Sequence, residues 1–280
     1  MRTYLDCLTC IVDQAIKTMQ LHTDDEQWIK QKMDDFFPMM REVKLERTPP
    51  ENGMMMYNYV AQVTGNPDLF RKVKQENTRK ALELYPYLKE RVETASDPLL
   101  TAVRIAIAGN IIDYGANRGF DLEKDVERVL QQDFARLDVE PFREQVEQAK
   151  QILYIGDNAG ETVFDRVLIE TMGKPTVFAV RERPIINDAT REEAQAAGLH
   201  RVARIISSGS PVPGTPLNLC NREFLELFHT SDVVIAKGQG NYETLSDAPR
   251  PIFLMFQVKC HVIARHVGMP KGSIVLWYQS

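Results

Sequence analysis

The sequence contains little that would mark a secreted or membrane-inserted protein. Its 280 residues include four cysteines, too few and too unevenly spread for a disulfide framework. Asp6 falls where a signal peptide needs its apolar core, and no apolar run approaches the length of a membrane span. We therefore expect a cytoplasmic protein.

An excess of positive charge is also absent. The 34 Lys and Arg residues against 39 Asp and Glu residues give a formal net charge of −5, so we expect no general attraction to nucleic acid or to a membrane surface. A phosphorylated ligand would need a local cationic pocket. The hydrophobic share of 44% and the charged share of 26% are those of an ordinary globular chain.

The pattern of apolar residues along the chain changes near residue 150. Residues 1–150 show helical spacing of apolar residues and predict an all-helical domain, with one helix starting at Asp97 or Pro98. Residues 151–280 alternate short β-rich runs with helical stretches and predict a mostly parallel, Rossmann-like sheet in a three-layer α/β domain. The predicted strands cover 152–155, 176–180, 203–206, 233–236, 252–256 and 273–277.

Two predicted strands are followed by pairs of oxygen-bearing side chains. Asp157 and Asn158 follow the first strand, and Asn187 and Asp188 follow the second. Each pair has a simple alternative role as a helix cap. Because ligands of parallel sheets bind beyond the carboxyl ends of the strands, the two pairs are also placed to converge on one hard cation.

A lysine and a glycine-rich turn follow the predicted strand at 233–236. Lys237 with Gly238 and Gly240 offers one ammonium and exposed backbone N–H groups, which suit a phosphate, although the segment can equally be only a loop. The order of residues fits neither a P-loop nor a dinucleotide fingerprint.

Taken together, these blocks resemble the signature blocks of the damage-control phosphatase family, formerly the domain of unknown function eighty-nine, which includes proteins called acidic-residue methyltransferase-like. The matching segments are Gly-Asp-Asn-Ala-Gly-Glu at 156–161, Asn-Asp-Ala-Thr at 187–190 and Lys-Gly-Gln-Gly-Asn-Tyr-Glu at 237–243. Further similar segments lie at 4–10, 108–115, 208–215 and 259–264, so the resemblance covers nearly the whole chain. The Cys-x-x-Cys start resembles the prokaryotic stand-alone branch.

The resemblance implies a metal-dependent phosphatase that acts on small phosphorylated metabolites, such as sugar phosphates or damaged phospho-metabolites. It implies Asp157, Asn158 and Asp188 as ligands of Mg²⁺, Mn²⁺, Co²⁺ or Ni²⁺, with Lys237 on the phosphate. The catalytic residues expected are Asp157, Asp188 and Lys237, and the expected substrate-binding residues are Lys237, Gly238, Gly240, Asn241, Glu161, Asn187, Asn110 and Asp113. Asn110 and Asp113 have the alternative of a polar helix face.

Several alternatives stay open at this point. The attacking group is either Asp157 or a water molecule, with Asp188 or Glu161 as its base. A non-catalytic sensor of a phosphorylated metabolite would share the same pocket, and a methyltransferase is suggested only by a name within the family. The pair Cys7 and Cys10 is half a zinc site, a redox pair or simple packing.

Overall fold

One sheet organises the computed structural model, which describes residues 1–110 and 122–280. Among these residues seven strands pair in the order β1-β7-β6-β5-β2-β3-β4, and all neighbours are parallel except the antiparallel pair β6 and β7. The strands are β1 (Phe134–Leu137), β2 (Ile152–Ile155), β3 (Thr176–Val180), β4 (Arg204–Ser207), β5 (Val233–Lys237), β6 (Ile252–Gln257) and β7 (Ile274–Gln279).

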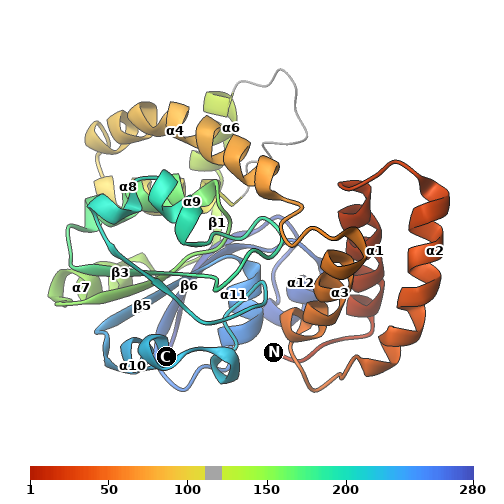
Figure 1. The fold of residues 1–280 in the computed structure, drawn as a ribbon. Coiled ribbons are helices and arrows are strands. Elements are labelled where there is room, and N and C mark those ends of the chain that lie inside the picture. The colour runs from red at the N-terminus through yellow and green to blue at the C-terminus, as the bar shows by residue number, and fades with distance from the viewer. Residues whose placement is uncertain (111–121) are drawn as a thin grey trace.

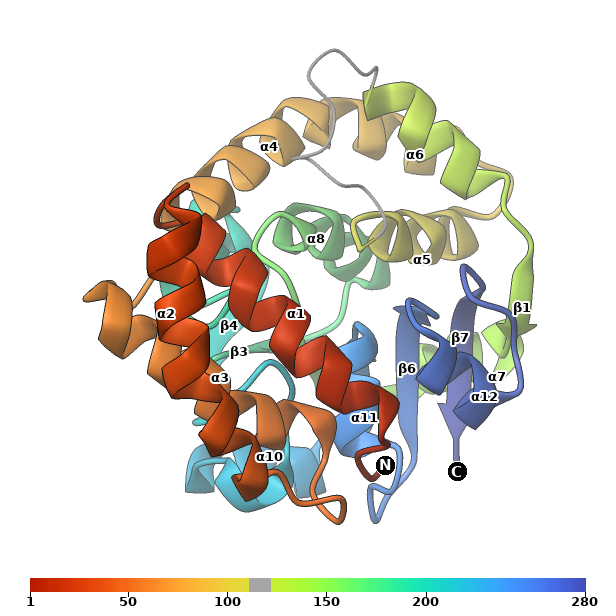
Figure 2. The ribbon, with the colours of Figure 1, turned by 90° about the vertical axis from the view of Figure 1, so that its right-hand side faces the viewer.

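Helices cover both faces of the sheet, and three further helices stand to one side of it (Figure 1 and Figure 2). No helix in the described ranges combines the length and the apolar character that crossing a membrane requires. The helices are α1 (Asp6–Gln20), α2 (Glu26–Phe36), α3 (Pro49–Thr64), α4 (Arg71–Glu93), α5 (Pro98–Ala108), α6 (Leu122–Leu130), α7 (Val139–Gln148), α8 (Glu161–Met172), α9 (Arg191–Ala196), α10 (Arg222–Thr230), α11 (Gln239–Leu245) and α12 (His261–Val267), with short 3₁₀ turns η1 (Phe37–Glu42), η2 (Leu199–Arg201) and η3 (Leu217–Leu219).

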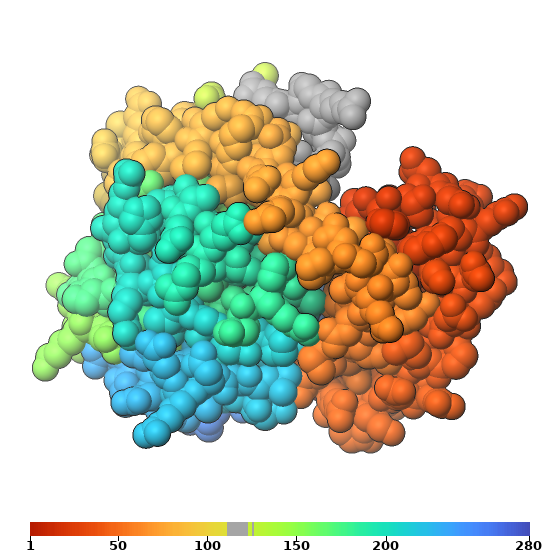
Figure 3. Space-filling model, in the orientation of Figure 1, coloured from red at the N-terminus to blue at the C-terminus, as the bar shows by residue number. Residues whose placement is uncertain are grey.

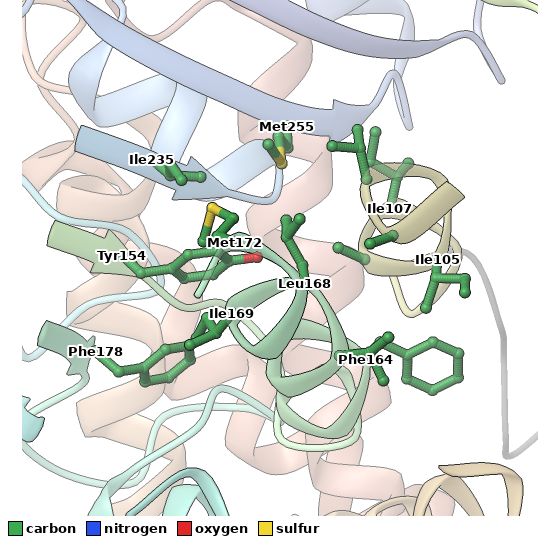
Figure 4. Close-up of a cluster of buried hydrophobic side chains, with 14 of the residues drawn as sticks. Ile105, Ile107, Tyr154, Phe164, Leu168, Ile169, Met172, Phe178, Ile235 and Met255 are labelled. Atoms are coloured by element: carbon green, nitrogen blue, oxygen red, sulfur yellow. The ribbon is translucent and has the colours of Figure 1, made fainter. Parts of the chain in front are cut away.

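The central strands are buried on both faces, because each face carries a layer of helices. Tyr154 and Ile152 join a core with residues of α4, α5 and α8, while Leu153 and Ile155 join a second core with residues of α10 and α11. This alternation follows from the two-residue period of a strand. Figure 4 shows part of the first core, in which Tyr154 and Phe178 lie beside the side chains of α8.

The expected mostly parallel α/β sheet is confirmed, and all six predicted strands are present with ends that shift by at most a few residues. The predicted start of a helix is also confirmed, because the Asp97 side chain accepts a hydrogen bond from the N–H of Leu100 at 3.1 Å. The expectation that residues 1–150 are all helical is wrong at β1. This strand is short, lies at the edge and pairs with β7 alone, so its sequence lacks the apolar run of a central strand.

The helices of the N-terminal half divide into two groups. Helices α1, α2 and α3 share a small core of their own and form what we call the N-terminal lobe, which lies beside the α/β body in Figure 3. Residues of α4, α5, α6 and α7 instead share one core with the sheet. A domain boundary at residue 150 stays a prediction, and the hydrophobic core continues across that position, from Val146 to Ile152.

Candidate active site

The two predicted pairs of polar residues meet at the carboxyl ends of β2 and β3. Asn158 and Asp188 form an antiparallel backbone bridge. On either side of it the N–H of Ala159 donates to the carbonyl oxygen of Asn187, and the N–H of Ala189 donates to that of Asp157, both at 2.8 Å. The backbone therefore fixes the two junctions against each other.

Helix capping does not explain these residues. Helix α8 has Gly160 at its N-cap and no side-chain cap. Helix α9 is capped by Thr190, whose hydroxyl and N–H both pair with the Glu193 carboxylate in a capping box. The capping alternative is thus wrong for Asp157, Asn158 and Asp188, whose side chains point to other partners.

Two side-chain amides donate hydrogen bonds to the Asp157 carboxylate. Its Oδ2 accepts hydrogen bonds from Asn110 Nδ2 at 3.0 Å and from Asn158 Nδ2 at 3.2 Å. Both amides also donate to the carboxylate of Glu161. Asn110 therefore contacts Asp157 and Glu161, while its predicted contact with a substrate stays a prediction. Asp113 lies outside the described residues.

A buried arginine that the sequence analysis missed joins the two carboxylates. The Arg181 guanidinium donates to Asp188 Oδ2 at 2.7 Å and lies 3.7 Å from Asp157 Oδ1. Its other nitrogens donate to Thr215 Oγ1 at 2.9 Å and to Asn241 Oδ1 at 3.2 Å. The signal was a charged residue directly after the buried strand β3.

The carboxylates of the site carry more negative charge than the buried surroundings favour. Burial raises the pKa of Asp157 well above its usual range, and the charges of Glu161 and Asp188 act in the same direction. Burial likewise raises the pKa of Asp188 to about 6, against the opposing effect of Arg181. A further positive charge at these oxygens would therefore be stabilised.

Lys237 lies beneath the site and not in its wall. Its ammonium, fully buried, donates to Ala106 O at 2.7 Å, to Asp165 Oδ1 at 2.7 Å and to Glu161 Oε2 at 3.2 Å. An ammonium has three protons, so these partners use all of them. The predicted contact of Lys237 with a phosphate stays a prediction, and the structure directs its protons to protein oxygens. Asp165 was not predicted.

The glycine-rich turn after β5 packs against the carboxylates. Gly238 has φ +80°, and a Cβ at this position would lie 1.8 Å from Asp157 Oδ2. A Cβ at Gly240 would lie 2.3 Å from the carbonyl oxygen of Pro213. Asn241 is buried and donates to the carbonyl oxygens of Gly156 at 3.0 Å and Lys237 at 2.7 Å. The turn therefore needs small residues for close packing.

A cavity of about 770 Å³ opens above these residues, between the α/β body and the N-terminal lobe. Of the predicted residues, Asp157, Asn158, Asn187, Asp188 and Gly240 line it. The other described residues of the prediction do not line the cavity and lie behind its wall; they are Asn110, Glu161, Lys237, Gly238 and Asn241.

Lys259 is the lining residue that supplies a cation, and the sequence analysis did not assign it. Its ammonium makes no hydrogen bond or ion pair with a described residue. Its charge lowers the pKa of both Asp157 and Asp188, although burial remains the larger effect and raises both. The signal was its place just after β6, in one of the blocks that resemble the family. The local cationic group expected from the net charge is therefore available here.

The cysteine pair lines the same cavity from α1. Cys7 is buried and Cys10 exposed, both are free thiols, and burial raises the pKa of each. The described residues contain no group of three or more His, Cys, Asp or Glu side chains arranged to hold a metal ion. The described residues therefore do not complete a zinc site with Cys7 and Cys10.

The fold is that of an α/β protein with a mostly parallel sheet. Its cavity and oxygen-rich side chains lie at the carboxyl ends of the strands, where such proteins bind ligands. The particular family is shown by comparison: the family model described as the damage-control phosphatase ARMT1-like domain matches residues 3–275. The chain belongs to this family.

Individual relatives agree over almost the full length. A damage-control phosphatase of Pyrococcus horikoshii is 35% identical, with 98% of this chain and 97% of that protein covered, and one of Archaeoglobus fulgidus is 31% identical, with 96% of each covered. The crystal structure of a DUF89 family protein from Pyrococcus horikoshii superimposes with a TM-score of 0.93 at 34% identity, and each chain is covered completely. The resemblance of the sequence to this family is thereby confirmed.

Proposed function

We propose that this protein is a phosphatase that uses a divalent cation to hydrolyse phosphate monoesters of small, unwanted or damaged metabolites. The names of the Pyrococcus and Archaeoglobus relatives support the phosphatase reaction. The chemistry of the site itself supports the cation, and the lysine that lines the cavity supports a phosphoryl group.

The donor set fits a hard divalent cation. The Oδ1 atoms of Asp157, Asn158 and Asp188 accept no hydrogen bond from a described residue, and all three residues line the cavity. Two carboxylate oxygens and one amide oxygen are ligands that Mg²⁺ and Mn²⁺ accept. These three oxygens carry the proposal: none accepts a hydrogen bond from a described residue, although Asp157 Oδ1 has a nearby cation, the Arg181 guanidinium at 3.7 Å.

When bound there, the cation would polarise a phosphoryl oxygen and offset its charge. The ligands themselves are oriented by the residues behind them. Because Asn158 Nδ2 donates to Asp157 and to Glu161, its Oδ1 is left for the cavity. Arg181 holds one oxygen of Asp188 and leaves the other free. Such supporting contacts set the position and charge of ligand atoms.

Charge on the phosphoryl group is met by Lys259, whose ammonium is free in the described structure. Glu161 is assigned to positioning and not to proton transfer, because its carboxylate is occupied by Asn110, Asn158 and Lys237. Phosphoryl transfer depends mainly on positioning and electrostatic stabilisation, so a cation, a lysine and oriented oxygens are sufficient for it.

The test is hydrolysis of p-nitrophenyl phosphate and a panel of sugar phosphates after chelation and addition of Mg²⁺, Mn²⁺, Co²⁺ or Ni²⁺. We expect turnover only with a cation. Asp157→Asn should lower kcat/KM by about a hundred-fold or more, since a missing electrostatic stabiliser of a transition state has effects of this order. The exposed Asp34, paired only with Lys30, provides the control Asp34→Asn.

Two results would contradict the proposal. The first is full activity in chelator without added metal, and the second is an Asp157→Asn enzyme as active as the wild type. Binding of phosphate without turnover under every metal would instead identify a sensor of phosphorylated metabolites.

A further inference from the structure

A tyrosine of the N-terminal lobe lines the cavity and carries a hydroxyl group without a hydrogen-bond partner among the described residues. Tyr57, on α3 of the N-terminal lobe, lines the cavity together with Asp157 and Asp188. Its hydroxyl makes no hydrogen bond with any residue in the described ranges. Tyr59, two positions further along the same helix, instead donates to the carbonyl oxygen of Lys32 at 2.6 Å.

Charged groups that line the cavity act on the Tyr57 hydroxyl. Burial raises the pKa of this hydroxyl above its ordinary value, and the charge of Asp188 raises it further, followed by Cys10 and Glu243. All three of these residues line the cavity. The hydroxyl therefore stays protonated at neutral pH and is available as a donor.

A phosphate in this cavity needs donors as well as positive charge. Asp6 and Glu243 line the cavity beside the proposed cation ligands and repel an anion, while Lys259 is the one Lys or Arg among the described lining residues. A neutral hydroxyl can pair with a phosphoryl oxygen without adding charge to the site. Tyr57 comes from the N-terminal lobe and the two aspartates among the proposed cation ligands come from the α/β body, and all three residues line the same cavity.

We propose that Tyr57 binds the phosphoryl group of the substrate, with its hydroxyl donating a hydrogen bond to a non-bridging oxygen. The inference rests on the proposed function and assigns the N-terminal lobe a direct part in it. The lobe then contributes one donor to a site whose cation ligands and lysine all come from the α/β body.

The test compares Tyr57→Phe with Tyr59→Phe, a matched change on the same helix. Binding of inorganic phosphate to the Mn²⁺-loaded protein is measured by calorimetry, and kcat/KM is measured with p-nitrophenyl phosphate. We expect Tyr57→Phe to weaken phosphate binding about ten-fold or more, because hydrogen bonds to charged groups have effects of this size, and to lower kcat/KM as well. Tyr59→Phe should bind phosphate like the wild type.

Unchanged phosphate binding by Tyr57→Phe overturns the inference, even if the KM for a larger substrate rises, because the hydroxyl would then contact the organic part. Failure of the proposed function is a separate result. If the wild type hydrolyses no substrate with any metal, the proposed phosphatase function is wrong. If Tyr57→Phe still weakens phosphate binding in that case, the assignment of Tyr57 to a phosphate site stands.

Discussion

Replacement of Lys237 by methionine separates a structural lysine from a phosphate-binding one. The ammonium is fully buried and pairs with two carboxylates that are themselves buried, those of Glu161 and Asp165. Lys237→Met keeps the volume and removes the charge, so both carboxylates lose their cation. Removing one partner of a buried ion pair costs about 3 to 5 kcal/mol.

This loss converts into a measurable change in melting temperature. Unfolding entropies near 2 cal/mol/K per residue give roughly 0.6 kcal/mol/K for a chain of 280 residues. The expected decrease in Tm is therefore about 5 to 8 °C. Thermal unfolding of the metal-free protein, followed by circular dichroism, measures it without any contribution from bound ligand.

Lys259→Met provides the matched comparison, because this lysine is exposed and its ammonium has no partner in the described chain. We expect its Tm to stay within about 1 °C of the wild type, while phosphate binding is lost. The reasoning is refuted if Lys237→Met melts like the wild type and Lys259→Met keeps its affinity for phosphate. That result would return the phosphate contact to Lys237.

Two further predictions concern the surroundings of the cavity. Gly238→Ala should displace the Asp157 carboxylate and abolish most cation-dependent activity, whereas Gly272→Ala, also at positive φ but with open space around it, should cost only about 1 kcal/mol of stability and no activity; equal activities of the two variants would contradict this. Burial raises the pKa of Glu243 to about 7, against about 4.5 when unfolded. Between these values the folded protein binds the extra proton, so stability should fall as pH rises from 4.5 to 7, and Glu243→Gln should flatten this slope in denaturant titrations.

The sequence was sufficient for six of the seven described strands and for the pairs of polar residues after β2 and β3, because both follow from local patterns. Strands such as 152–155 and 176–180 are short apolar runs, and polar residues after them fall at the carboxyl edge of a parallel sheet. The burial of Lys237 beneath the site could not be predicted. It depends on where Asp165 and the carbonyl oxygen of Ala106 lie, and these belong to α8 and α5, which reach the site only through tertiary packing.

Each junction offered a capping role and a binding role, and the structure shows how these can be told apart. A side chain that caps a helix has its oxygen occupied by backbone N–H groups, as Asp97 does at α5. Asp157, Asn158 and Asp188 are polar, sit just before helices and cap none of them, and each keeps one oxygen without a hydrogen bond from a described residue. These three oxygens remain accessible at the cavity, unlike Asn110 Oδ1 and Asp165 Oδ2, which are buried without a hydrogen-bond partner in the described structure. An oxygen that caps no helix and is accessible from a cavity is available to a ligand, so such oxygens distinguish a binding role from a capping role.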